Sequence, residues 1–140
     1  METGFQNDSL AVRTSDGEDD VLLEPLIFIS QFGVCYRAPT GSTTDGLSTP
    51  KVVRIIPGYD STGDDWWSGV LHDAGYRGTL EKESPHGDFV RADLTRPQVD
   101  ELMLDAMTSQ KVNPVRRHII FWAVRLFGAK AWRKGHSKPL

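Results

Sequence analysis

The sequence is poor in cysteine and has no long apolar run, and each absence excludes a class of protein. Cys35 is the single cysteine, so an internal disulfide and a zinc site of four cysteines are excluded. The longest strongly apolar runs, 26–29 and 119–124, fall far short of the roughly 20 residues that a membrane-spanning helix needs. A phosphate-binding loop and a dinucleotide-binding glycine pattern are also missing. We therefore expect a chain with no membrane span and no nucleotide-binding motif.

What the chain does contain is enough apolar material for one folded domain. It has 140 residues, of which 39% are hydrophobic and 25% charged, as is usual for a globular domain. We expect a flexible acidic arm over residues 1–20, a single domain over residues 21–133 and a basic tail over residues 134–140.

The charges are unevenly distributed, although the formal net charge is only −3. Residues 1–65 hold 11 acidic and 4 basic side chains, whereas the last 30 residues hold 8 basic side chains and no acidic one. Such asymmetry indicates a surface for a charged partner, but the two halves could equally attract each other within the fold. Because the overall balance is acidic, nucleic acid is not the partner we expect. The alternative is that Trp132 stacks on bases between Lys130 and the pair Arg133–Lys134.

Apolar spacing and turn residues predict an α+β fold. A short antiparallel β portion, about residues 21–45, contains two strand-like runs, Leu22–Ser30 and Val34–Arg37, joined by a turn with Gly33. Pro25 indicates an edge strand or a late strand start. We expect this β portion to pack against about three helices. Their expected bounds are 63–76, 96–109 and 114–127, with a further short helix over 51–56 and a loop over 78–93.

Capping residues support the second and third helices. Thr95 with Gln98 forms a capping-box pattern, and Asn113 followed by Pro114 is a typical helix start. In the third helix the i, i+3, i+4 spacing of apolar residues predicts a face turned toward the core. The residues of that face are Val115, Ile119, Trp122, Ala123 and Leu126.

Polar residues on the first two helices form a candidate site. His72 and Tyr76 are four residues apart and project together, roughly opposite the apolar stripe of their helix, with Asp73 between the two sides. A histidine near carboxylates can hold a divalent metal, or act as a base whose tautomer a carboxylate fixes. The candidate metal ligands are His72, Asp73, Asp45 and Asp100. Because most of these ligands are oxygens, the set favours Mg²⁺ or Mn²⁺ over structural zinc.

A metal-dependent hydrolase would use largely the same residues. Its candidate catalytic residues are His72, Asp73, Asp45, Tyr76 and Ser48. In that mechanism Tyr76 would orient or polarise the substrate beside the ion. A serine triad of Ser48, His72 and Asp100 is less supported, because no nucleophile-elbow pattern surrounds Ser48.

The competing interpretation is a structural hydrogen-bond network with no catalytic role. Asp45 would then cap the turn that follows it, while His72 and Tyr76 would tie that loop to the helix. Asp100 and Asp105 would be solvated acids on the helix surface. A single His-Asp pair carries little specificity, so both interpretations stay open.

Several short motifs occur in an order that is typical of one known family. They are Thr44-Asp45, Ser48 with Pro50, His72-Asp73 with Tyr76, Asp100, Ala106-Met107, Ala123-Val124-Arg125, Gly128 and Ala131-Trp132. In these motifs the chain resembles the domain of unknown function 1353 family, over about residues 22–133. It departs from the family pattern at Lys51, where we expect arginine, and at Val99, where we expect alanine. Lys51 keeps the charge but loses the bidentate geometry of arginine, which weakens an anion-binding role there.

The resemblance implies an origin in tailed phages or prophages and no particular reaction, since the family has no assigned activity. We expect a small virion- or tail-associated protein that binds other phage proteins and is located in the virion or the host cytoplasm. The alternative is the metal-dependent hydrolase with its His-Asp centred site. The sequence leaves the oligomeric state and the partner's identity open.

Overall fold

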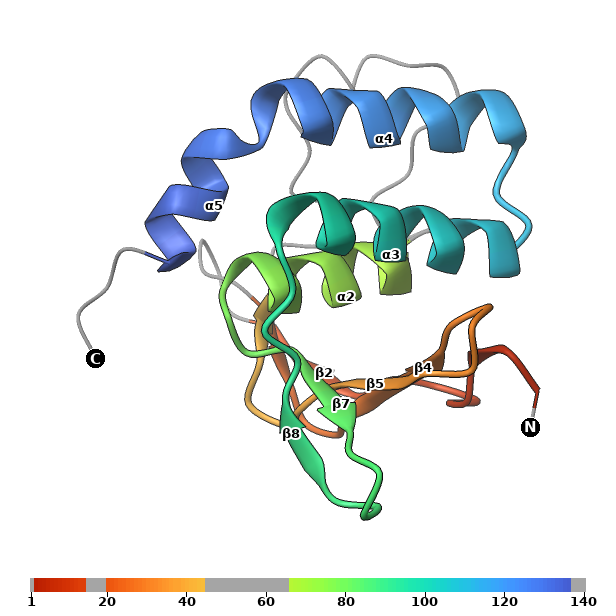
Figure 1. The fold of residues 1–140 in the computed structure, drawn as a ribbon, viewed down its shortest axis with the longest axis vertical. Coiled ribbons are helices and arrows are strands. Elements are labelled where there is room, and N and C mark those ends of the chain that lie inside the picture. The colour runs from red at the N-terminus through yellow and green to blue at the C-terminus, as the bar shows by residue number, and fades with distance from the viewer. Residues whose placement is uncertain (1, 15–19, 45–65, 137–140) are drawn as a thin grey trace.

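A computed structural model describes residues 2–14, 20–44 and 66–136 of the chain. In this part of the protein, antiparallel β-sheets form one layer and the helices stack above it (Figure 1). The expected α+β class, with a short antiparallel β portion packed against helices, is confirmed.

The larger sheet has five strands in the order β1-β4-β5-β7-β8, and every neighbouring pair is antiparallel. Its strands are β1 (Gly4–Phe5), β4 (Leu26–Ile29), β5 (Cys35–Ala38), β7 (Glu81–Glu83) and β8 (Phe89–Arg91). Strands β4 and β5 form the predicted hairpin, and the turn between them places Gly33 at a φ of 83°, a conformation that glycine adopts without strain. Pro25 directly precedes β4, so the late strand start is also confirmed.

A second sheet contains β2 (Val12–Arg13), β3 (Asp20–Leu22) and β6 (Thr43–Thr44), in the order β2-β3-β6. Both β1 and β2 lie in the segment that we expected to be an arm outside the domain. Phe5 on β1 contacts the ring of Phe28 at 4.9 Å and that of Trp67 at 5.5 Å, measured between ring centroids. This part of residues 1–20 therefore packs on the core, while the other boundaries of the domain stay predictions.

The prediction of a loop over residues 78–93 is wrong, because strands β7 and β8 form a hairpin there that extends the larger sheet. Arg37 on β5 contacts both of these charged strands. Its Nη2 lies 2.7 Å from Glu81 Oε1 on β7, and its guanidinium carbon lies 4.0 Å from the centre of the Phe89 ring on β8. Polar and cation–π contacts across strands can stabilise strands that lack alternating apolar residues. A search for apolar periodicity therefore misses such strands.

Four helices lie in the described residues: α2 (Trp66–Tyr76), α3 (Arg96–Ser109), α4 (Pro114–Phe127) and α5 (Ala129–His136). The predicted bounds of α3 and α4 are confirmed, and so is the capping box, in which Thr95 and Gln98 bond reciprocally. The short helix expected over 51–56 and the expected start of the first helix at residue 63 lie outside the described residues. Within the described ranges no helix is long and apolar enough to cross a membrane.

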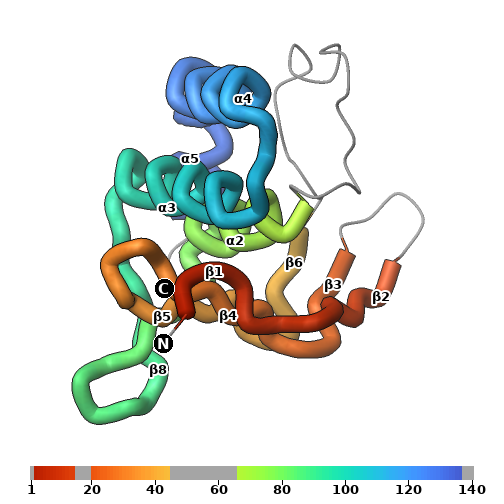
Figure 2. The backbone as a smooth tube through the Cα atoms, turned by 90° about the vertical axis from the view of Figure 1, so that its right-hand side faces the viewer, coloured from red at the N-terminus to blue at the C-terminus, as the bar shows by residue number. Residues whose placement is uncertain are grey.

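Helix α2 lies between the sheets and α3, which buries it on both sides (Figure 2). The core on its sheet side includes Leu22, Leu26, Phe28, Val70 and Leu71. A second apolar cluster joins α3 to α4 and contains Met103, Met107, Val112, Ile120, Ala123 and Val124. Helices α2 and α3 both contact the sheets, α4 packs on α3, and the outer side of α4 is left without a described element against it.

The inward face predicted for α4 is wrong except at Ala123. Ile120, Ala123 and Val124 are buried, whereas Val115, Ile119, Trp122 and Leu126 are all exposed. Both sides of this helix are apolar, so the spacing of apolar residues could not show which side contacts α3. The consequence is an apolar face turned to solvent.

Candidate functional site

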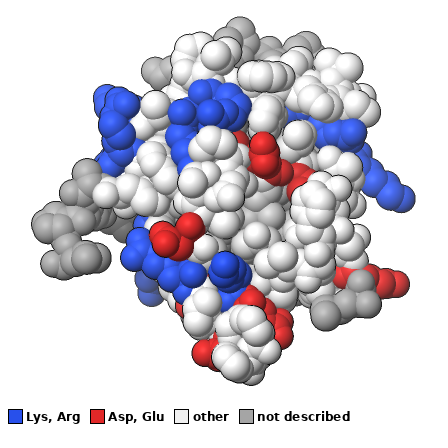
Figure 3. All heavy atoms as spheres, viewed as in Figure 1, with Lys and Arg blue, Asp and Glu red and all other residues white. Residues whose placement is uncertain are grey.

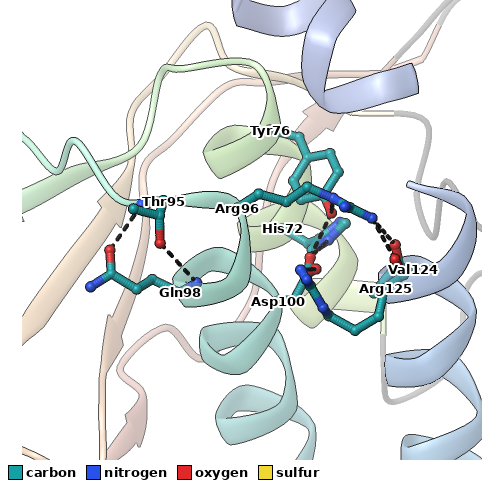
Figure 4. A network of polar contacts seen from close by, with 8 residues as sticks. All are labelled: His72, Tyr76, Thr95, Arg96, Gln98, Asp100, Val124 and Arg125. Atoms are coloured by element: carbon teal, nitrogen blue, oxygen red, sulfur yellow. Dashed lines mark hydrogen bonds and ion pairs between the residues drawn. The ribbon is translucent and has the colours of Figure 1, made fainter. Parts of the chain in front are cut away.

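A single buried carboxylate, that of Asp100 on α3, joins three helices (Figure 4). Its Oδ1 lies 2.9 Å from His72 Nε2 and accepts a hydrogen bond from the Tyr76 hydroxyl at 2.7 Å, both residues belonging to α2. Its Oδ2 accepts a hydrogen bond from Arg125 Nη1 on α4, also at 2.7 Å. These donors replace the hydrogen bonds that water would otherwise make to a carboxylate.

The local sequence of α2 explains why two donors reach one oxygen. His72 and Tyr76 are one helical turn apart, and their ring centroids are separated by 4.1 Å. Gly75, between them in the chain, lets α3 approach closely, since a Cβ atom there would lie 2.4 Å from Val99 Cγ1. The predicted joint projection of His72 and Tyr76 is confirmed, and Asp100 is the residue that they meet.

Arg96 extends this network to the end of α4. Its Nε donates to the Tyr76 hydroxyl at 3.1 Å, while its Nη2 donates to the carbonyls of Val124 and Arg125 at 2.8 and 2.7 Å. The last four carbonyls of a helix have no partner within it, so an arginine that reaches them acts as a cap. The start of α3 is therefore tied to the end of α4.

The electrostatics keep Asp100 ionised and Tyr76 neutral. Burial by itself would raise the pKa of Asp100, but hydrogen bonds from His72 and Tyr76 and the guanidinium of Arg125 outweigh it, and the pKa is lowered. Burial and the hydrogen bond to Asp100 raise the pKa of Tyr76, so its hydroxyl remains a donor. A carboxylate only accepts hydrogen bonds, which means that His72 Nε2 carries a proton in this arrangement.

Asp73 belongs to a different contact, although it is adjacent to His72 in the chain. Its Oδ2 accepts a hydrogen bond from the Thr44 hydroxyl on β6 at 2.6 Å. His72 thus points toward α3, whereas Asp73 points toward the smaller sheet. Asp45 and Ser48 lie outside the described residues, so their closeness to either group stays a prediction.

The interpretation of Asp100 and Asp105 as solvated surface acids is wrong. Asp100 is fully buried, and Asp105 is half-buried, with its Oδ2 accepting a hydrogen bond from the Gln31 backbone N–H at 3.0 Å. Burial raises the pKa of Asp105, and the Gln31 bond offsets only part of that rise. Helical spacing alone could not show whether these acidic residues are buried or exposed. The side of α3 that α2 and α4 cover contains a polar residue, Asp100, among its apolar ones.

The described residues contain no group of three His, Cys, Asp or Glu side chains arranged to hold a metal ion. Among the predicted ligands that the structure describes, His72 contacts Asp100 and Asp73 contacts Thr44, and both Asp100 oxygens already accept hydrogen bonds. Two cavities that the structure shows do not include Asp100 in their lining: a groove of about 630 Å³ follows α4, and a pocket of about 410 Å³ lies beside α5. Chemically, the Asp100 cluster is suited to holding α2, α3 and α4 together.

Two arginines that complete the cluster, Arg96 and Arg125, were missing from the predicted site. Arg125 had a signal, because it ends the Ala-Val-Arg motif that the family resemblance singles out. Arg96 had none, since its role depends on the crossing of α3 and α4 in space.

A comparison with known families supports the resemblance that the sequence motifs indicated. Residues 21–124 match the family described as "Protein of unknown function (DUF1353)". The chain belongs to this family. No curated protein and no solved structure matches it. In this DUF1353 protein three of the motif residues singled out from the sequence, His72, Tyr76 and Arg125, contact a fourth, Asp100.

Trp132, from the late Ala-Trp motif of the DUF1353 chain, packs against the same cluster. Its ring meets that of Tyr76 edge-on at 5.2 Å and stacks on His136 at 3.7 Å. One face of the indole is therefore already covered by a side chain of α5. This packing gives less support to the alternative in which Trp132 stacks on nucleic-acid bases.

Proposed function

We propose that this DUF1353 protein is a small virion- or tail-associated phage protein that works by binding other phage proteins. The exposed apolar face of α4 carries the proposal, because Val115, Trp122 and Leu126 on it are 69%, 58% and 70% exposed. Contiguous apolar patches of this kind on soluble proteins mark interaction surfaces. The proposed location is the virion or the host cytoplasm.

The Asp100 network supports the same proposal indirectly. Its hydrogen bonds join three helices in a fixed arrangement. Both oxygens of the Asp100 carboxylate already accept hydrogen bonds within the protein. A rigid scaffold that presents an apolar helix face fits a binding module better than an enzyme.

The composition of purified virions tests this function. We expect mass spectrometry to detect the protein at a constant ratio to the tail proteins, because a structural component is incorporated in fixed number. A non-structural protein made by the same phage serves as the control and should be absent. Virions that lack the chain would contradict the proposal.

The alternative, a metal-dependent hydrolase with His72, Asp73, Asp45 and Asp100 as ligands, has less support. His72 and Asp73 are directed to different partners, Asp100 and Thr44. A divalent ion bound with a Kd one hundred times below its concentration would stabilise the fold by about 2.7 kcal/mol.

We therefore expect Mg²⁺ or Mn²⁺, each at about 1 mM, to change the melting temperature by less than about 1 °C, since weaker sites add little stability. The measurement is thermal unfolding with and without the ion, compared within each variant. A rise of several degrees that is present in the wild type and absent in both His72→Ala and Asp73→Ala would favour the hydrolase.

A further inference from the structure

The outer face of α4 has the spacing of a helix-binding surface. Val115, Ile119, Trp122 and Leu126, here called the α4 stripe, follow one another at intervals of four, three and four residues. All four are exposed, and they line the groove of about 630 Å³ together with Pro114, His118 and Ala123. Residues at such intervals form one ridge along a helix, and such ridges pack into the grooves of another helix.

The charged side chains of the segment that carries the α4 stripe are of one sign. Between Lys111 and His136 the chain has seven Lys and Arg residues and no Asp or Glu. The exposed ones lie at the two ends of α4, with Lys111 before its first turn and Lys130, Arg133 and Lys134 after its last. Figure 3 shows Lys and Arg side chains in the upper part of the molecule, where α4 lies, and further ones lower down among Asp and Glu side chains.

We propose that the α4 stripe binds an amphipathic helix of another protein that carries Asp or Glu at both of its ends. This inference rests on the proposed protein-binding function and names the chemistry of the partner. The stripe from Val115 to Leu126 is about 16 Å long at 1.5 Å per residue, so a partner helix of three to four turns covers it. The partner's apolar residues contact the stripe, and its acidic ends lie against Lys111 and Lys130.

A second copy of the chain fits this surface poorly. Because both ends of α4 are basic, a symmetric pair would place like charges together whether the two helices ran parallel or antiparallel. Like charges brought together across an interface oppose association.

An anionic membrane surface also fits less well than a helix. Interfacial helices extend their basic side chains toward the lipid headgroups. Two of the basic residues of α4 are directed inward instead: Arg117 Nη1 donates to the Val112 carbonyl at 3.0 Å, and Arg125 donates to Asp100. Few exposed basic side chains therefore lie along the stripe, and those that are exposed lie near its two ends.

The test uses the full chain and a designed 18-residue helical peptide with a leucine stripe and glutamates at both ends. A matched peptide replaces the glutamates with lysines. We expect the glutamate peptide to bind at least tenfold more tightly by fluorescence anisotropy, and its affinity to fall as salt is raised, because exposed charges are screened. Equal affinity for the two peptides, or no binding of the glutamate peptide, would overturn the inference.

Variants of the chain locate the site. Trp122→Ala removes an exposed anchor and should weaken binding of the glutamate peptide at least tenfold, since buried tryptophans dominate interfaces. Phe32→Ala removes an exposed aromatic ring from the β4–β5 turn and should leave binding unchanged. The double variant Lys111→Glu/Lys130→Glu should reverse the preference between the two peptides, which a merely misfolded protein would not do. Failure of that reversal would overturn the role of the basic ends.

Two further measurements test the other two candidates for binding to the α4 stripe, which are a second copy of the chain and an anionic membrane. Sedimentation of the wild type should show a monomer, and vesicles of phosphatidylcholine with phosphatidylserine should not bind in a Trp122-dependent way. A dimer or vesicle binding that Trp122→Ala abolishes would overturn the inference. If virions contain the protein but the glutamate peptide does not bind, the partner chemistry is wrong while the proposed function stands. If the peptide binds but virions lack the protein, the proposed function fails alone.

Discussion

Replacing Asp100 with alanine is expected to lower the free energy of unfolding by roughly 3–5 kcal/mol, the usual cost of removing one partner from a buried charged cluster. The change leaves His72, Tyr76 and Arg125 without their common acceptor in the interior. Urea unfolding followed by circular dichroism measures this loss. Glu101 is the matched control, because it is the next residue on the same helix but is exposed, and Glu101→Ala should change stability by less than about 0.5 kcal/mol.

The same carboxylate predicts a dependence of stability on pH. The folded-state pKa of Asp100 is lowered, so the ionised form is favoured by folding. Its contribution is therefore fully present above the unfolded pKa of about 3.9 and is lost as the pH falls through the lower folded pKa. The difference in stability between wild type and Asp100→Ala should accordingly narrow as the pH falls below about 4. A difference that does not narrow in acid, or a loss for Asp100→Ala as small as that for Glu101→Ala, would contradict the role given to the network.

The second large effect is expected where α2 crosses α3. A Cβ atom on Gly75 would lie 2.4 and 2.9 Å from the two methyl carbons of Val99, closer than real Cβ contacts come. Gly75→Ala should therefore destabilise the fold by roughly 1–3 kcal/mol, as overpacking does, even though alanine is the better helix former.

A double-mutant cycle separates this clash from other effects of the glycine. Val99→Ala removes both methyl groups that a Cβ at residue 75 would meet, so it should relieve most of the cost of Gly75→Ala. The coupling between the two changes should then exceed about 0.5 kcal/mol, measured from unfolding free energies of all four proteins. Simple additivity would show that the close approach of the two helices does not limit this position.

The sequence predicted those parts of the fold that short-range rules determine. The capping box of Thr95 and Gln98 and the start at Asn113 gave the bounds of α3 and α4 because their hydrogen bonds lie within one turn. The β4–β5 hairpin was likewise visible from two apolar runs around a glycine turn. The β7–β8 hairpin was not, since β7 pairs with β5 and contacts Arg37, which lies more than 40 residues earlier in the chain.

The candidate site shows the same division. The joint projection of His72 and Tyr76 follows from their spacing on one helix, and it was predicted. The burial of Asp100 and the contributions of Arg96 and Arg125 depend on how α2, α3 and α4 cross, which no local pattern encodes. The orientation of α4 was predicted wrongly for a related reason, because a helix that is apolar on two sides gives two equally valid faces.

The edges of the two sheets have a consequence for how this protein can assemble. In the described part of the chain, the outer strands are β1 and β8 in one sheet and β2 and β6 in the other, and each is only two or three residues long. Edges this short offer few unpaired backbone groups to an incoming strand. Association by β-augmentation is therefore disfavoured, and a variant that loses the α4 face should lose the proposed partner helix rather than bind it through the sheet.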